Sequence, residues 1–223
     1  MPNPPGRTQD LPSGYPSSYE SAVGLAEGRQ VEIRPILPSD APELAEAIRT
    51  ADAETLHARF LGGAPQLTDA VLDKLTRVDY VRRFALVARS RGRGVAVARC
   101  GVLPRSRDGS PAADVAVTVA PEWRRVGLAT ALVELLARRA QECGITDFTA
   151  LFLAENRPVT KLAREGHARV VIAEGVAQLH AALTTPRPDW PNRNRSEERR
   201  KKLAFPAETG TFSPSGGPLD VGS

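Results

Sequence analysis

The stretch ADVAVTVAPEWRRVGLATALVELL, residues 113–136, decides the fold. Its first third alternates polar and apolar residues, which is typical of a β-strand. Its last third repeats leucine at helical spacing, which predicts an amphipathic helix that starts near Gly127. A strand–turn–helix junction of this kind turns free main-chain amides toward an anion, and Arg124 and Arg125 add positive charge. Two explanations remain open from these residues alone: an anion-binding turn, or a plain helix start with solvated arginines.

Outward from this stretch, strand and helix patterns alternate along the chain. The glycine-containing turn at Gly92 joins two strands and opens no helix, so it predicts a hairpin and not a dinucleotide-binding loop. The order of elements predicts an α/β fold of the α+β type, a mixed sheet with helices on both faces. Strands are predicted at 30–37, 84–90, 94–103, 113–120, 147–154, 168–173 and 175–183, and helices near 39–48, 51–61, 68–78, 128–143 and 158–165.

Composition divides the 223-residue chain into three parts. Residues 1–29 are rich in Pro, Gly and Ser and are expected to be a disordered tail, the domain is expected at 30–183, and 184–223 is expected to be a second disordered tail. Between 187 and 202 there are seven basic and three acidic residues, a surplus that accounts for the whole net charge of +4. The basic character therefore belongs to the tail, where a solvated segment is favoured over a nucleic-acid-binding one.

The remaining totals indicate a globular protein of a reducing compartment. Cys100 and Cys143 each lie in an apolar periodic segment and are predicted to be buried free thiols. No secretory signal or membrane-spanning run is present, so a cytoplasmic location is expected. His57, His167 and His180 are scattered, and no metal site is expected.

Several motifs together resemble the GNAT family of N-acetyltransferases. RRVGLA, residues 124–129, fits the family's Arg/Gln-x-x-Gly-x-Gly/Ala signature, and LAENRPVTKLAREGHARVV, residues 153–171, resembles its second motif. The resemblance spans roughly 31–180 and is closest to the acetyltransferase domain of bacterial protein-lysine acetyltransferases. It also includes ETLHARF, LTRVDYVRRFALVA and ADVAVTV, which start at residues 54, 75 and 113.

The resemblance implies a mostly antiparallel sheet, splayed at one point, that binds acetyl-CoA. The pyrophosphate would lie on the amides of the turn, and the pantetheine arm would pair with the 113–120 strand beside a gap. Asn156 would bond the pantetheine arm. The alternative role for Asn156 is the N-cap of a helix ahead of Pro158, and this role is compatible with a bond to the arm. The cofactor-binding residues so implied are Val117, Thr118, Val119, Arg124, Arg125, Val126, Gly127, Leu128, Ala129, Thr130 and Asn156.

The reaction implied is direct attack of an amine on the thioester, with a carboxylate to remove the proton. Asp114 stands where the lysine-specific branch has a Glu, and a solvated strand-edge Asp is the alternative; Glu155 is a weaker candidate base. Leu162 replaces the Tyr that protonates the leaving thiolate in many members, so solvent would supply that proton. His167 replaces an aromatic residue after the Gly of the second motif.

The expected function is therefore an acetyl-CoA-dependent N-acetyltransferase whose first-choice acceptor is a protein lysine. A small amine is the second choice. The alternative from another functional class is a non-catalytic acyl-CoA sensor. It is suggested by Asp114, which is shorter than the Glu of the family, and by Leu162 in place of the Tyr. Binding of nucleic acid is expected only through the tail, if at all, and the oligomeric state is left open.

Overall fold

The alternating segments pair into one eight-stranded sheet in the order β1-β2-β3-β4-β5-β6-β8-β7. The computed structural model describes residues 11–61, 66–104 and 110–183. Within them, β5 and β6 pair in parallel and every other neighbouring pair is antiparallel, as expected for a mixed, mostly antiparallel sheet. The strands are β1 (Ser21–Gly24), β2 (Gln30–Pro35), β3 (Arg83–Ser90), β4 (Arg93–Val102), β5 (Ala112–Val119), β6 (Asp147–Leu153), β7 (Arg169–Ala173) and β8 (Val176–Ala182).

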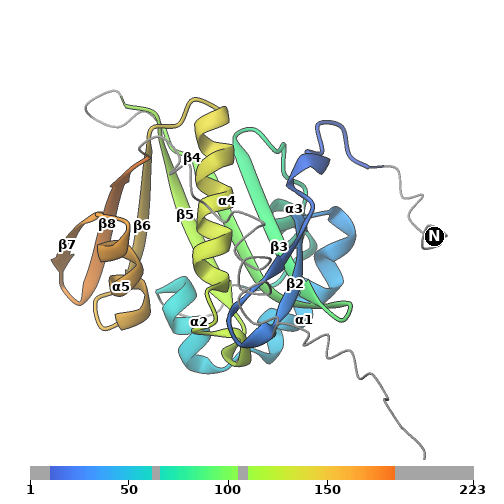
Figure 1. Ribbon diagram of the computed structural model, residues 1–223, viewed down its shortest axis with the longest axis horizontal. Helices are drawn as coiled ribbons and strands as arrows, with labels where there is room; N and C mark the ends of the chain where they lie inside the picture. Colours follow the sequence, from blue (N-terminus) through green and yellow to red (C-terminus); the bar gives the residue numbers. More distant parts are fainter. Residues whose placement is uncertain (1–10, 62–65, 105–109, 184–223) are drawn as a thin grey trace, which may run out of the picture. The chain divides into compact units, whose positions relative to one another are not determined.

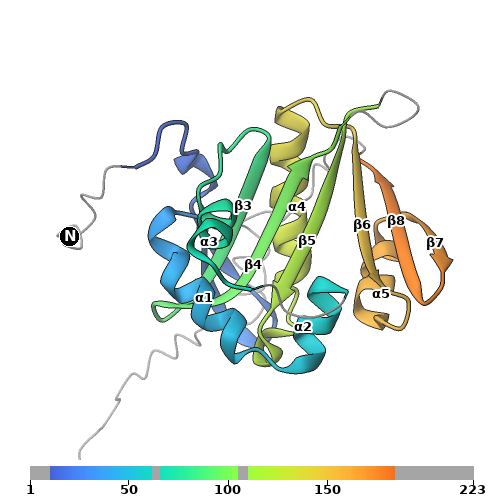
Figure 2. The ribbon, with the colours of Figure 1, turned by 180° about the vertical axis from the view of Figure 1, so that it is seen from behind.

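Helices cover both faces of this sheet. The long helix α4 crosses one face (Figure 1), and α1 to α3 lie on the other (Figure 2). The α-helices are α1 (Ala41–Thr50), α2 (Ala53–Phe60), α3 (Asp69–Thr76), α4 (Leu128–Glu142) and α5 (Arg157–Glu165). Short 3-10 turns are η1 (Ser17–Tyr19), η2 (Ala26–Gly28), η3 (Pro38–Asp40) and η4 (Pro121–Trp123). None of the helices in the described ranges is long and apolar enough to cross a membrane.

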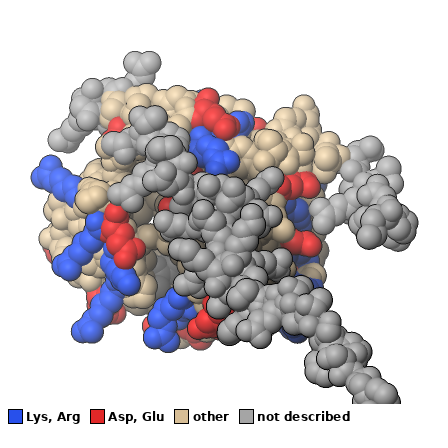
Figure 3. All heavy atoms as spheres, viewed as in Figure 1, with Lys and Arg blue, Asp and Glu red and all other residues tan. Residues whose placement is uncertain are grey.

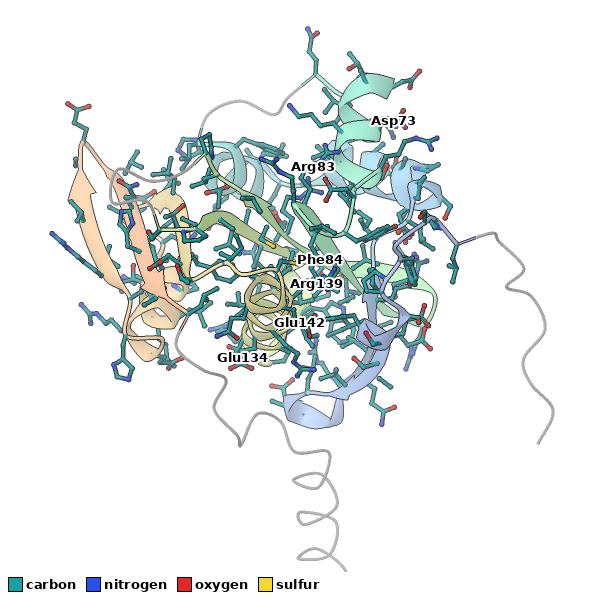
Figure 4. The ribbon with its side chains drawn as sticks, turned by 90° about the horizontal axis from the view of Figure 1, so that it is seen from above. Asp73, Arg83, Phe84, Glu134, Arg139 and Glu142 are labelled. Atoms are coloured by element: carbon teal, nitrogen blue, oxygen red, sulfur yellow. The ribbon has the colours of Figure 1, made fainter. Side chains whose placement is uncertain are left out.

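The leucine stripe of α4 fixes that helix on the sheet. Its buried face packs into the main core with Phe84 of β3 and Phe148 of β6. At the end of the helix, Arg139 lies 5.9 Å over the Phe84 ring and donates to Glu142 at 3.1 Å (Figure 4). Burying one such leucine contributes about 1.5–3 kcal/mol, so the stripe anchors the helix start that precedes it. The buried residues of α4 are Leu128, Ala131, Leu132, Leu135, Leu136 and Ala140.

The helix starts follow from local side-chain chemistry, with one difference. Thr68 caps α3, because its hydroxyl accepts from the Val71 N–H at 3.3 Å. Asp40 precedes α1 but makes no cap bond to that helix. Its carboxylate instead accepts from the Leu37 N–H at 2.7 Å and forms a buried ion pair with Arg34 at 2.5 Å. The buried Arg34 guanidinium binds this carboxylate, which therefore does not cap α1.

The prediction of a disordered N-terminal tail is wrong for residues 11–29. This segment forms η1, β1 and η2, and β1 adds an antiparallel edge to β2. Tyr19 is only 4% exposed and stacks edge-on to Phe84 at 5.3 Å. A few large apolar side chains among prolines and serines order the segment through contacts with the distant core, which a local composition average does not register. The tail expectations for 1–10 and 184–223 fall outside the described residues.

Of two smaller expectations, the hairpin turn at Gly92 is confirmed, and the expectation of buried free thiols is confirmed for Cys100 and only in part for Cys143. Gly92 lies in the tight turn of the β3–β4 hairpin. Cys100 and Cys143 are free thiols, the first buried and the second partly buried. Burial raises the pKa of the Cys100 thiol to about 12.

Candidate active site

The sheet opens into a fork between β5 and β6. The two strands pair in parallel at three positions, and Asp114 opposite Thr149 is the last of them. From there β5 stays paired with β4 as far as Val119, and β6 stays paired with β8 as far as Leu153. Figure 2 shows the two strands separating toward the end of the sheet at which α4 begins. One side of β5 after Asp114 is therefore a free strand edge inside the sheet.

Hydrogen bonds at both ends of β5 show which of its main-chain groups face the fork. The Ala120 N–H donates to the Val95 carbonyl at 2.9 Å, and the Ala112 carbonyl accepts from Leu103 at 2.9 Å. The register between these two bonds is unbroken, so even-numbered residues direct their N–H and C=O groups toward β4. Odd-numbered residues direct theirs into the fork. The fork-facing residues are Val115, Val117 and Val119, whereas the main chain of Thr118 faces β4.

The turn before α4 lies at the open end of this fork (Figure 1). Arg125 has φ 64° and Gly127 has φ 90°, so the backbone passes twice through the left-handed region. Val126 between them is buried, and the first bond within the helix runs from the Ala131 N–H to the Gly127 carbonyl at 3.1 Å. A Cβ placed at Gly127 meets no atom within 4 Å, so the space over the helix start is open. Amides of a first helical turn have no acceptor within their own helix and are free to meet an anion there.

Arg124 crosses the mouth of the fork toward α2. Its Nη2 donates to the Thr55 hydroxyl at 2.8 Å, and its Nε makes a longer bond, 3.4 Å, to the Val119 carbonyl. Thr55 in turn donates both its N–H and its hydroxyl to Asp52, at 2.7 Å each, and these bonds lower the pKa of that carboxyl. The exposed side chain of Arg125 lies on the same turn. Sequence reasoning missed Thr55, because nothing local marks a threonine whose partner is 69 residues away.

Asn156 begins α5 just beyond the end of β6. Its side-chain oxygen accepts from the Val159 N–H at 3.2 Å, and its own N–H donates to the Leu153 carbonyl at 2.8 Å. The N-cap role considered for this residue is therefore confirmed. The cap employs the side-chain oxygen and fixes the direction of the side-chain amide.

The two candidate bases lie at opposite ends of the fork, and both are exposed. Asp114 lies at the closed end, opposite Thr149, on the sheet face away from α4. Glu155 follows the last residue pairs of β6, at the open end. Leu162 lies partly buried on α5, and His167 is exposed with φ 54° in the turn after that helix. Among the described residues no group of three His, Cys, Asp or Glu side chains is arranged to hold a metal.

A family model described as an acetyltransferase (GNAT) domain matches residues 30–168, more than half of the chain. The chain belongs to the GNAT family of N-acetyltransferases. The match covers the fork, the turn before α4 and Asn156, and it confirms the family resemblance and the fold class.

Individual GNAT proteins agree with this assignment. The chain is 30% identical over 142 residues to an acetyltransferase of Pseudomonas aeruginosa, PA5475, across 62% of this chain and 74% of that protein. It is 28% identical over 140 residues to the acetyltransferase Pat of Mycolicibacterium smegmatis, across 63% of this chain and 41% of that longer protein. The crystal structure of the GNAT domain of S. lividans PAT superimposes with a TM-score of 0.67 and 29% identity, over 75% of this chain and 99% of that one.

The fold is shared with more distant GNAT structures. That of yncA from Salmonella typhimurium, solved with acetyl-CoA, has a TM-score of 0.55 at 17% identity, over 71% of this chain and 98% of that one. At this identity the likeness concerns the fold alone.

Proposed function

We propose that this GNAT protein transfers the acetyl group of acetyl-CoA to the side-chain amine of a protein lysine. The observation that carries the proposal is the free edge of β5: main-chain groups of Val117 and Val119 face the fork without a β6 partner. An extended arm rich in amides can pair with such an edge as another strand does. The edge leads from the turn before α4 to the exposed carboxylate of Asp114.

The cofactor path follows this edge. The pyrophosphate would lie on the amides from Arg125 to Thr130, with Arg124 and Arg125 adding charge-assisted contacts. From Val119 to Asp114 the strand spans roughly 17 Å, a length that an extended pantetheine arm can cover. The thioester would then arrive beside the closed end of the fork.

One of the sequence-based site residues, Thr118, takes a different role. Val117 and Val119 bond the arm, and Thr118 does not bond it through its main chain, because those groups face β4. The fork-facing N–H of Val115 or Val117 is placed to bond the thioester oxygen as negative charge develops there. The side-chain amide of Asn156, held by the cap, is available to the arm from the β6 side of the fork.

Asp114 is the proposed general base. A lysine amine is protonated at neutral pH and must lose a proton before it attacks the thioester. Asp114 lies at the end of the fork where the thioester would arrive, whereas Glu155 lies at the other end. Asp is one methylene shorter than Glu, so an intervening water would carry the proton to its carboxylate. With Leu162 in place of a tyrosine, the leaving thiolate takes its proton from solvent.

A protein acceptor follows from the resemblance to the lysine-specific branch of the family. The exposure of Asp114 supports it, because a lysine carried by a folded protein must reach the base from outside. Within the same proposal the enzyme acts in the cytoplasm. The folded domain is proposed to span 11–183.

Thiol release measured with acetyl-CoA and three acceptors tests the proposal: a lysine peptide, a polyamine and no amine. We expect turnover with the peptide, a loss of roughly 10²–10⁴-fold in Asp114→Asn, and partial recovery of that variant at high pH, where the amine deprotonates by itself. Glu155→Gln is the matched carboxylate control and should retain activity. Turnover with the polyamine alone would redirect the proposal to small amines. Calorimetric binding of acetyl-CoA without any turnover would favour the sensor.

A further inference from the structure

The N-terminal segment contacts the turn that leads into α4. The Ala26 N–H donates to the Val126 carbonyl at 3.1 Å. The Arg29 guanidinium lies 5.2 Å over the Trp123 ring and donates to the Glu122 carbonyl. These contacts join parts of the chain more than 90 residues apart in sequence. In Figure 1 the turn between β1 and β2 lies beside the start of α4.

The contacted turn needs external support. Arg125 adopts φ 64°, a region in which a Cβ crowds the following carbonyl, and only glycine adopts it without steric cost. Such a conformation persists where surrounding groups hold it. The N-terminal contacts fall on both sides of Arg125, at Glu122 and Trp123 before it and at Val126 after it. They hold the turn in the shape that its own sequence disfavours.

The segment that provides the contacts is itself well defined. β1 and β2 pair over four residue positions, and the last pair, Gly24 with Gln30, leaves only residues 25–29 for the turn between them. The Leu25 N–H donates to the Arg29 carbonyl at 2.8 Å and closes this turn. Glu27 Oε2 lies 3.4 Å from Nη2 of Arg29, while Nη1 of the same guanidinium donates to the Glu122 carbonyl. Arg29 is thus oriented before any ligand arrives.

We propose that Arg29 is a positioning residue, which together with the Ala26 N–H holds the turn 122–127 in the conformation that receives the cofactor pyrophosphate. This inference rests on the proposed function, since that function places the pyrophosphate on this turn. When a binding turn adopts its competent shape only part of the time, the apparent Kd rises by the inverse of that fraction. Once acetyl-CoA is bound, the turnover rate does not depend on Arg29, because this residue touches no reacting atom.

Two variants remove the support by different means. Arg29→Ala removes the ring contact and the bond to Glu122. Ala26→Pro replaces the N–H that reaches Val126 with the proline Cδ, which cannot donate and comes against that carbonyl, and proline suits the first position of a 3-10 turn. Because Ala26→Pro changes no charge, it separates positioning from a direct ionic contact of Arg29 with phosphate. The control is Arg169→Ala, which removes the same charge from an exposed position on β7.

Three measurements are made on the full chain: the calorimetric Kd for acetyl-CoA, the KM and kcat of thiol release, and hydrogen exchange of amides 124–131 without ligand. In both variants we expect Kd and KM to rise about five- to tenfold, the loss of one or two modest contacts. We expect kcat at saturation to change by less than about twofold. Exchange of the turn should accelerate, and Arg169→Ala should match the wild type in every measurement.

If hydrogen exchange of amides 124–131 is unchanged in both variants, the inference that the N-terminal contacts hold the turn is overturned. Turnover by the wild-type enzyme would in that case still support the proposed function. Faster exchange with an unchanged Kd overturns the positioning role. A higher Kd in Arg29→Ala but not in Ala26→Pro overturns it in favour of direct ionic contact. If wild-type protein fails to bind acetyl-CoA, the proposed function fails, and the positioning role fails with it.

Discussion

Gly127 offers a sharp test of the proposed pyrophosphate turn, because the same helix carries a matched control at its other end. Gly127 precedes α4 with φ 90°, and Gly144 follows it with φ 76°. A Cβ added at either position meets no atom within 4 Å. Alanine therefore introduces backbone strain of the same kind at both sites and no clash within the protein.

The size of each effect follows from this geometry. A left-handed conformation costs a residue with a Cβ about 1–2 kcal/mol. For a domain of this size, each kcal/mol lowers Tm by roughly 2–4 °C, so both variants should melt roughly 2–8 °C lower. Only the Cβ at Gly127 enters the space over the helix start. It keeps the pyrophosphate from one or two charged hydrogen bonds of about 1.5–3 kcal/mol each, so Kd should rise at least about tenfold.

Calorimetric titration of acetyl-CoA, with differential scanning calorimetry for Tm, measures both effects. Gly127→Ala should lose affinity as well as stability, and Gly144→Ala should lose stability alone. Equal Kd values for the two variants, at comparable Tm, would refute the assignment of this turn to the pyrophosphate.

Three further outcomes follow from single residues. Asn156→Ala should lower the free energy of unfolding by about 1 kcal/mol in urea denaturation, because the cap of α5 is lost. If the same variant loses more binding free energy for acetyl-CoA than unfolding free energy, Asn156 also contacts the pantetheine arm. Asp40→Ala should cost about 3–5 kcal/mol in the same assay, since it leaves the Arg34 guanidinium buried without its partner; a loss below about 1 kcal/mol would contradict the buried pair. Alkylation near pH 8 should modify Cys143 long before Cys100, because the pKa of Cys100, raised by burial to about 12, keeps it in the unreactive protonated form over that range; peptide mapping that finds Cys100 modified first would contradict this.

The parts of the fold that sequence predicted are those with strong local signals. Thr68 before an apolar-periodic run, Asn156 before a proline and a short helix, and the leucine stripe after Gly127 each act within one turn of chain. Such signals depend on residues three or four positions apart, and nothing distant overrides them here. The position of the turn and the succession of elements from β2 onward were predictable for this reason.

The parts that sequence did not predict depend on partners far along the chain. Alternation along β5 was evident, but which of Val117 and Thr118 faces the fork depends on its register with β4. Tyr19 reads as one aromatic residue among prolines and serines until Phe84 is placed beside it. The ion pair of Asp40 likewise requires Arg34 from the preceding strand.

The charge distribution was predictable as a total from the sequence, but its arrangement on the surface was not. The surplus between residues 187 and 202 predicted that the rest of the chain is electrically balanced. On the face in Figure 3, the visible Lys and Arg side chains lie interspersed with Asp and Glu.

The most direct test of the proposed reaction is mass spectrometry after incubation of the enzyme with a cell lysate and isotope-labelled acetyl-CoA. We expect labelled acetyl groups on lysine side chains of a limited set of proteins, and strongly reduced labelling with Asp114→Asn at neutral pH. Label that appears only on small amines, or no label from an enzyme that binds acetyl-CoA in calorimetry, would contradict transfer to protein lysine.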